Sequence, residues 1–464
     1  MMLAKLNGKF LVVIIIALLS FLLPGCYLVD PAPEYYKQGN VYYEQNQFNE
    51  AITAYSQAIE RNPKLALAYI NRAEAYNQVG KYDLAINDCD TALEIDSKLV
   101  LAYVTRAAAY NETGQYALAL ADCNKALEID PKFAQAYLNR AWTYYNQGKY
   151  DFSIADSTQA INLEPELALA YVSRARSYNE TGEYELAILD CNKAISLDLP
   201  CIQAYLNRAW AYLETGRYEL ALADYNKAIE LCPDKATAYS NRAWGYTKMG
   251  SFDEAIADCN KAISIDPNLP QAYVNRAWAY LEKLACDHSQ DYCKLAIADC
   301  NTALRLNPEY LTAYTTRAWA YIINSSYRLA IVDCNRALEI NPYYMLIYNV
   351  RAQAYIGLRD FDLAIADCSK AIEANPEFAP PYNTRAIAYR GKDMVDQALT
   401  DCNKALQLDD ELALAYLTRG RIYVGLDRID EAIADFQKVL EVTEDCELVE
   451  IAELELAALG VELP

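Results

Sequence analysis

The sequence predicts an all-α solenoid, in which helix hairpins of one kind are stacked along the chain. Three observations predict it. Tyrosine recurs every 34 residues in two series, which run from Tyr69 to Tyr273 and from Tyr76 to Tyr280. Each repeat carries two apolar stripes with the i, i+4, i+7 spacing of one helix face. Turn-forming stretches such as NETG separate the two stripes, and a proline closes most repeats.

Residues 1–25 have the layout of a secretory signal peptide. Lys5 and Lys9 form a positive start, and the apolar run Phe10–Leu23 follows. The stretch LPGC ends at Cys26 and resembles a bacterial lipobox, although Pro24 departs from the usual residue of that motif. The resemblance implies that Cys26 is lipidated and becomes the new N-terminus, with residues 26–31 as a tether.

The alternative for this segment is an uncleaved membrane anchor. The run Phe10–Val29 is about long enough to span a bilayer, which takes roughly 20 residues. Both interpretations leave the lysines inside and place the rest of the chain outside the cytoplasm. A compartment of that kind permits disulfides.

Residues 32–446 contain twelve repeats in succession, whose positions are counted here from 1 to 34 with Val100 at position 1. Position 8 is almost always alanine, positions 4 and 11 are usually tyrosine, and positions 20, 24 and 27 are small or apolar. We therefore expect two antiparallel helices in each repeat. Their alanines allow a close approach, and the tyrosines fill the space beside them.

This pattern resembles the tetratricopeptide repeat, in its period and in the residue types at positions 8, 11, 20, 24, 27 and 32. The resemblance implies a right-handed superhelix of about twelve hairpins. It also implies an inner groove, lined by the first helix of each repeat, that holds peptides or protein segments. With its N-terminus, the chain is similar to a bacterial lipoprotein of this family. Within residues 447–464, a helix over Leu448–Leu459 is expected to cap the last exposed stripe.

Two recurring polar residues lie on the first helix of the repeats. Arginine recurs at position 7, from Arg72 to Arg419, and we expect it to pair with the aspartate that recurs at position 23 rather than with a ligand. Asparagine occupies position 6 in several repeats, where its amide can bond a peptide backbone. The asparagines predicted to bind a partner are Asn139, Asn207, Asn241 and Asn275.

All five tryptophans of the chain lie at position 9, on a second stripe that faces the groove in proteins of this family. They are Trp142, Trp210, Trp244, Trp278 and Trp319. Tryptophan offers a large contact area with one hydrogen-bond donor, so these residues are predicted to bind the partner. The alternative is that they pack on the helix of the adjacent repeat.

Eight of the 14 cysteines lie at position 24, on the core stripe. Equivalent helices of adjacent repeats lie roughly 8–10 Å apart, whereas a disulfide needs Cα atoms within about 7 Å. These cysteines are therefore predicted to be unpaired, buried and inert. Cys201 and Cys232 flank the helices of the sixth repeat, and they either form a disulfide or are unrelated thiols.

The eighth repeat, residues 270–310, contains seven extra residues in its turn. The only histidine of the chain, His288, lies there between Cys286 and Cys293. In an oxidising compartment we expect a Cys286–Cys293 disulfide. A metal site, with Asp287 or Asp291 as a fourth ligand, and a Cys–His nucleophile pair are the alternatives.

The composition excludes several classes of function. The formal net charge of −22 repels phosphate backbones, so we expect no nucleic-acid partner. The motifs of nucleotide, metal and triad chemistry are missing, so no enzymatic activity, cofactor or small-molecule substrate is expected. The leading hypothesis is a membrane-tethered scaffold that binds proteins in the periplasm or on the surface of a bacterium. A self-assembling structural solenoid and an accessory subunit of a cell-envelope enzyme complex are the alternatives.

Overall fold

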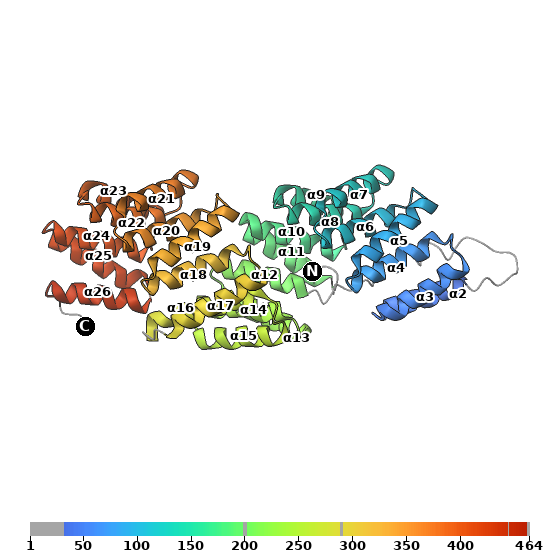
Figure 1. Cartoon of the computed structure of the whole chain (residues 1–464), viewed down its shortest axis with the longest axis horizontal. Coiled ribbons are helices and arrows are strands. Elements are labelled where there is room, and N and C mark those ends of the chain that lie inside the picture. Colours follow the sequence, from blue (N-terminus) through green and yellow to red (C-terminus); the bar gives the residue numbers. More distant parts are fainter. Residues whose placement is uncertain (1–31, 198–201, 288–290, 444, 462–464) are drawn as a thin grey trace. The chain divides into compact units, whose positions relative to one another are not determined.

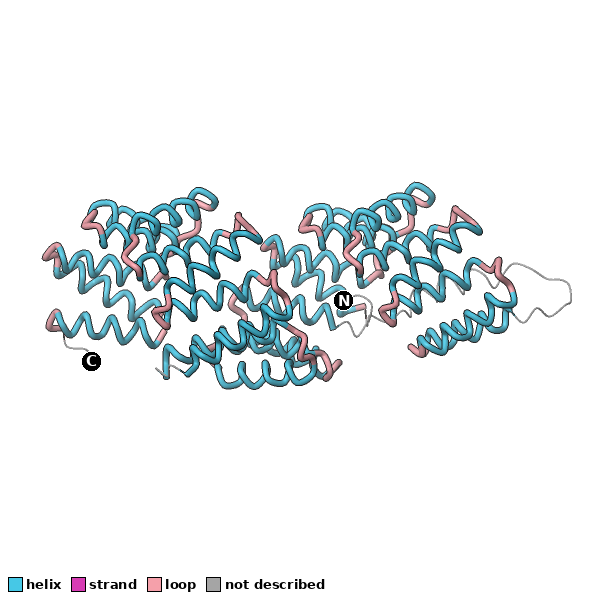
Figure 2. The backbone as a smooth tube through the Cα atoms, in the orientation of Figure 1, coloured by secondary structure: helices cyan, strands magenta, loops and turns pink. Residues whose placement is uncertain are grey.

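The computed structural model describes residues 32–197, 202–287, 291–443 and 445–461. Residues 1–31, which include Cys26, lie outside this range, and so do Cys201 and His288. Every regular element of the described residues is an α-helix (Figures 1 and 2). The helices form twelve consecutive hairpins and a final helix, so the prediction of an all-α solenoid is confirmed. The chain divides into two compact units, the first ending at Leu231 and the second beginning at Cys232.

Unit 1 contains six hairpins. They are α2 (Ala32–Glu44) with α3 (Phe48–Arg61), α4 (Ala66–Gln78) with α5 (Tyr82–Ile95), α6 (Val100–Glu112) with α7 (Tyr116–Ile129), α8 (Ala134–Asn146) with α9 (Tyr150–Leu163), α10 (Ala168–Thr181) with α11 (Tyr184–Ser196), and α12 (Ile202–Glu214) with α13 (Tyr218–Leu231).

Unit 2 contains six hairpins and the final helix α26 (Cys446–Ala458). The hairpins are α14 (Ala236–Lys248) with α15 (Phe252–Ile265), α16 (Pro270–Asp287) with α17 (Asp291–Leu306), α18 (Leu311–Ile323) with α19 (Tyr327–Ile340), α20 (Met345–Gly357) with α21 (Phe361–Ala374), α22 (Pro380–Gly391) with α23 (Val395–Leu408), and α24 (Ala413–Gly425) with α25 (Ile429–Val442).

Within each unit, consecutive helices pack against one another, and the first helices of neighbouring hairpins also touch. Contacts of the second kind join α4 with α6 in unit 1 and α14 with α16 in unit 2. Each first helix thus lies between its own second helix, the second helix before it and the neighbouring first helices. This arrangement places equivalent side chains of successive first helices next to each other.

The turn inside a hairpin needs a left-handed backbone at position 15. Glycine adopts a positive φ without a steric penalty, and it fills this position in six hairpins, with φ of 81° at Gly182. In five other hairpins this residue is not glycine, and φ lies between 55° and 64° at Asn46, Ser325, Arg359, Asp393 and Asp427. The turn-forming stretches in the sequence therefore mark a residue that must adopt a positive φ. A non-glycine residue there adopts it at a cost in conformational free energy.

The core of each hairpin consists of small side chains. In the third repeat Ala107, Ala119, Cys123 and Ala126, at positions 8, 20, 24 and 27, have 0% exposure. Most of the tyrosines at positions 4 and 11 pack against this core but stay half-buried, as Tyr110 does. The predicted core stripes are confirmed, and the tyrosines lie at the edge of the core rather than inside it.

Arginine at position 7 joins the two helices of its hairpin in every repeat after the first, and it also reaches the hairpin before it. Arg106 donates from Nε and Nη2 to the two carboxylate oxygens of Asp122, both at 2.7 Å, and from Nη1 to Asp90 of the preceding hairpin. Its guanidinium lies over the rings of Tyr103 and Tyr110, 5.6 and 5.9 Å from their centroids. The predicted pairing of positions 7 and 23 is confirmed in every hairpin that has both residues, including Arg276–Asp299 across the insertion. The other pairs are Arg72–Asp88, Arg140–Asp156, Arg174–Asp190, Arg208–Asp224, Arg242–Asp258, Arg317–Asp333, Arg351–Asp367, Arg385–Asp401 and Arg419–Asp435.

The cysteines at position 24 are free and buried, as predicted. They are Cys89, Cys123, Cys191, Cys259, Cys300, Cys334, Cys368 and Cys402. Burial raises the pKa of the Cys402 thiol to about 12 and that of Cys89 well above its usual range. Because the thiolate is the reactive form, these side chains are poor nucleophiles in the folded chain.

We expect iodoacetamide to modify the eight cysteines at position 24 on the order of a hundredfold more slowly than Cys232, which is half-exposed. Mass spectrometry of timed digests measures the rates site by site. The difference should vanish in denaturant. Equal rates in the folded chain would contradict the inert core.

The final helix covers the end of the last hairpin. Ala452 and Leu456 of α26 have 0% exposure and pack against Phe436 and Val439 of α25. The predicted cap is therefore confirmed. No helix within the described residues is both long and apolar enough to cross a membrane.

Candidate partner-binding site

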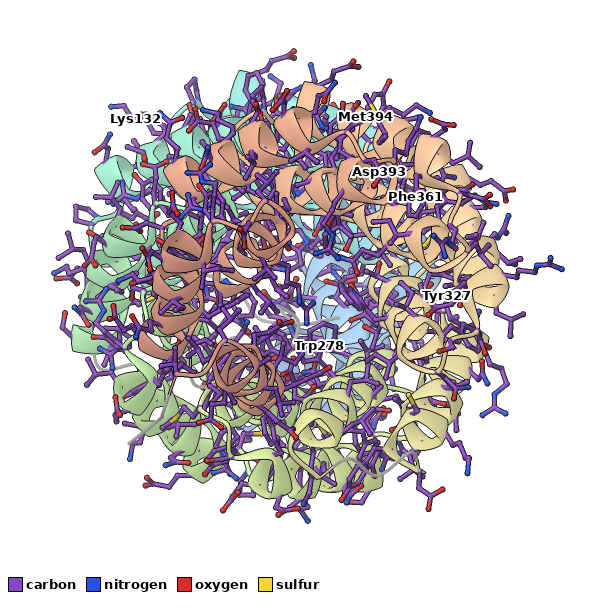
Figure 3. The ribbon with its side chains drawn as sticks, turned by 90° about the vertical axis from the view of Figure 1, so that its left-hand side faces the viewer. Lys132, Trp278, Tyr327, Phe361, Asp393 and Met394 are labelled. Atoms are coloured by element: carbon purple, nitrogen blue, oxygen red, sulfur yellow. The ribbon has the colours of Figure 1, made fainter. Side chains whose placement is uncertain are left out.

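Two of the predicted tryptophans form a pair in unit 2. The ring centroids of Trp244 in α14 and Trp278 in α16 are 6.4 Å apart, and the ring planes are inclined by 53°. Figure 3 shows Trp278 on the inner side of the curve that the helices of this unit make. Because α14 and α16 are in contact, position 9 of one repeat meets position 9 of the next. The pair is the part of the predicted tryptophan series that the structure brings together.

The other three tryptophans have different surroundings. Trp142 lies under the guanidinium of Arg176, which is 5.0 Å from a ring centroid and occupies position 9 of the next hairpin. Trp210 is 37% exposed. Trp319 packs against the hydrophobic cores of its own and the preceding hairpin, so it follows the alternative of packing between repeats.

The asparagines at position 6 are used inside the protein. The amide nitrogens of Asn139, Asn207 and Asn275 donate to main-chain carbonyls of the preceding first helix, at 2.9, 3.3 and 2.8 Å. The Oδ1 of Asn241 accepts from Gln271 Nε2 at 3.2 Å. These bonds tie neighbouring repeats together. A role of these asparagines in partner binding stays a prediction, and the tryptophan pair is the better candidate.

Charged side chains surround the tryptophan pair. Lys248 Nζ lies 4.8 Å from the ring centroid of Trp244. Glu282 follows Trp278 by four residues on α16, and burial raises its pKa, with a further rise from Asp445 and an opposing effect of Lys248. The Nε1 of Trp244 is buried and has no hydrogen-bond partner among the described residues. The surroundings of the pair are thus aromatic, partly desolvated and charged.

Asp445 reaches this place because α26 touches α16. Its carboxylate caps α26 by accepting from the main-chain N–H groups of Glu447 and Leu448, at 3.0 and 3.1 Å. α16 has 18 residues, whereas most first helices have 13. The insertion in the eighth repeat therefore lengthens α16 past Glu282, so that Glu282 lies inside the helix instead of at its end.

Sequence reasoning missed Lys248, Glu282 and Asp445. A signal for the first two was present, because position 13 follows position 9 by one helical turn and lies on the same face. The sequence places Lys248 after Trp244 and Glu282 after Trp278 with this spacing. No local pattern could indicate Asp445, which is distant in the chain.

The predicted Cys286–Cys293 disulfide is not formed in the structure, because the thiol of Cys293 is free. The thiol of Cys232 is free as well, which agrees with the alternative that Cys201 and Cys232 are unrelated thiols. Cys293 is 1% exposed, and its Sγ donates to the carbonyl of Ala320 in α18 at 3.5 Å. It therefore faces the packing between hairpins and not the tip of its own turn. The side chain of Cys286, like the residues Cys201 and His288, lies outside the described part of the structure.

Among the described residues, no group of three or more His, Cys, Asp or Glu side chains could hold a metal ion. Glu282 lies one helical turn after Trp278, and the one carboxylate that acts on it, Asp445, is engaged in capping α26. This arrangement offers contact area and charge to a ligand. The described side chains around the tryptophan pair do not place a nucleophile beside a general base.

Comparison with known proteins identifies the repeats. Models described as tetratricopeptide repeat match residues 66–99, 100–133, 202–235 and 236–269, residues 123–151, residues 138–199, and residues 347–378 and 413–446, and a model described as TPR repeat matches residues 39–80. The chain belongs to the tetratricopeptide repeat family. Proteins of this family are typically scaffolds without catalytic activity that bind protein partners.

No curated protein matches the sequence. Three solved structures resemble the chain loosely. The structure titled APC/C hetero-tetramer Cut9-Hcn1 is 14% identical with a TM-score of 0.48, and covers 97% of this chain and 99% of its own. Yeast Tom70 is 20% identical with a TM-score of 0.45, covering 92% and 96%. A tetratricopeptide repeat protein from Parabacteroides merdae is 21% identical with a TM-score of 0.43, covering 53% and 98%.

Proposed function

We propose that this tetratricopeptide repeat protein is a scaffold that holds an extended segment of a partner protein against the inner face of unit 2, centred on Trp244 and Trp278. The observation that carries the proposal is the tryptophan pair itself. Aromatic rings that meet across two first helices give one apolar surface of the kind that anchors interfaces. Trp319 packs against the hydrophobic core, and the guanidinium of Arg176 lies over the ring of Trp142, so neither ring offers an equivalent free surface.

The proposal is tested by panning a phage-displayed library of random peptides against the full chain. A double variant, Trp244→Ala with Trp278→Ala, serves as the counter-bait. We expect peptides that are enriched on the unchanged chain and lost on the double variant. A set of peptides that binds both baits equally, or no enrichment at all, contradicts a partner site at this pair.

We further propose that the scaffold works outside the cytoplasm, attached to a membrane through Cys26. The support is the sequence of residues 1–26, with its basic start, apolar run and LPGC stretch. The alternative anchor formed by Phe10–Val29 tethers the chain on the same side.

Cys26→Ser should abolish incorporation of radiolabelled palmitate by the full chain and leave the precursor uncleaved. Cells that express the unchanged chain should show the label and a smaller product on a gel. Unchanged labelling and mobility of the variant would show that Cys26 is not the attachment point.

A further inference from the structure

The charges around the tryptophan pair define what a bound segment presents there. We propose that this site takes a cationic side chain, an arginine or lysine of the partner segment, between Trp278 and the carboxylate of Glu282. The inference rests on the proposed function and adds the chemistry of the ligand to it.

The first observation is that a cation already lies on one ring of the pair. Lys248 Nζ is 4.8 Å from the ring centroid of Trp244, within the range of a cation–π interaction. Among the described residues, no cation lies in such a position over Trp278. Trp244 thus already makes a cation–π contact within the protein. Trp278, whose ring plane is inclined by 53° to that of Trp244, does not make one with a described residue.

The second observation is that Glu282 lacks a close partner. It is half-buried, and no hydrogen bond or ion pair to it occurs within the described residues. The nearest amine on the same helix, Lys283, pairs instead with Asp253 of the preceding hairpin. A desolvated carboxylate without a partner is costly, and a cation brought by a ligand relieves that cost.

The third observation is the balance of charge. One carboxylate, Asp445 before α26, and one amine, Lys248 of α14, act electrostatically on Glu282, and both α14 and α26 touch α16. The formal charge of the cluster is therefore negative. An anionic group of a ligand would be repelled by both carboxylates, whereas a guanidinium or ammonium gains from the carboxylates and from the indole face of Trp278.

The geometry depends on the insertion in the eighth repeat. Its extra residues extend α16 to Asp287, so the helix continues past Glu282. The same extended helix touches α26, which contributes Asp445. The longer helix thereby places the Glu282 carboxylate close to the tryptophan pair and keeps it partly out of water.

The test uses the full chain with ¹⁵N-labelled indole nitrogens and two small probes. Acetyl-arginine methylamide carries the guanidinium, and acetyl-citrulline methylamide has the same shape without charge. We expect saturable shifts of the Trp244 and Trp278 signals with the arginine probe, and an affinity for the citrulline probe lower by about fivefold or more. Nα-acetyl-lysine methylamide, whose side-chain ammonium is free, should bind as well, because the site recognises the positive charge.

Glu282→Gln is the matched variant, since it keeps the size of the side chain and removes its charge. It should weaken the arginine probe by about fivefold or more, with unchanged signals of Trp142, Trp210 and Trp319 as the check of folding. Equal shifts with both probes, no shift with either, or no effect of Glu282→Gln overturns the cation site. Panned peptides that need Trp278 but not Glu282 would overturn it while the proposed function stands.

Discussion

Replacing Arg317 by alanine should lower the free energy of unfolding of unit 2 by about 3–5 kcal/mol, the range found when one partner of a buried ion pair is removed. Arg317 donates to both oxygens of Asp333, at 2.7 and 2.6 Å, and the side chains are only 17% and 6% exposed. The variant leaves the Asp333 carboxylate buried without a cation. Urea denaturation followed by circular dichroism measures the change.

The matched control is Arg336→Ala. Arg336 pairs with Glu339 on the same helix, at 2.6 Å, but the side chains are 54% and 64% exposed. An exposed pair of this kind contributes about 0–1 kcal/mol. If both variants lost the same small amount of stability, the arginine at position 7 would not be the tie between hairpins that we describe.

The loss at Arg317→Ala should also depend on pH. Burial raises the pKa of Asp333, and Arg317 opposes that rise. Without Arg317 the folded-state pKa rises further above the unfolded value of about 3.9, so the folded state binds the proton more tightly. Stability then falls as the pH increases through this interval. The difference between the variant and the unchanged chain should therefore be smaller near pH 4 than near pH 7.

Gly420→Ala should destabilise the last hairpin by about 1–3 kcal/mol, a typical cost of overpacking a core. A Cβ atom at Gly420 would lie 2.6 Å from Cε1 of Phe436, whose ring has 0% exposure and therefore has no room to move. Gly39 faces Tyr55 in the first hairpin in the same way. At these hairpins an aromatic residue at position 24 is accommodated by the absence of a side chain at position 8.

Gly425→Ala is the control in the same helix, α24. A Cβ atom there meets nothing within 4 Å, so the change should be neutral or should stabilise the helix by up to about 1 kcal/mol. Thermal melting of both variants separates the two effects. A loss of stability at Gly425 as large as that at Gly420 would show that helix propensity, and not the contact with Phe436, decides the result.

Most of the fold could be predicted from the sequence because its elements are local and repeated. One period of 34 residues determines the helix pair, and the stripes at positions 8, 20, 24 and 27 determine which faces meet. The pairing of Arg72 with Asp88 was predictable because both residues belong to one repeat and recur together. The inert cysteines followed from the spacing of neighbouring repeats, as Cys123 shows with 0% exposure.

Predictions failed or stayed open where the outcome depends on packing between hairpins. The direction of the Cys293 side chain is decided by α18, which accepts its hydrogen bond through Ala320, so two cysteines near one turn do not form the expected pair. The different surroundings of the five tryptophans also come from neighbours: Arg176 lies over Trp142, and two hydrophobic cores enclose Trp319. The meeting of Glu282 with Asp445 joins α16 to α26, and no pattern within a single repeat encodes it.

We propose above all that the pair Trp244 and Trp278 binds a segment of another protein. The most direct measurement is the affinity of a panned peptide for the full chain and for Trp278→Ala, determined by fluorescence anisotropy, with Trp210→Ala as the control on an exposed tryptophan of unit 1. We predict a loss of about thirtyfold or more for Trp278→Ala, which corresponds to roughly 2 kcal/mol, and almost none for Trp210→Ala. Equal affinities of the unchanged chain and a folded Trp278→Ala variant would contradict the claim.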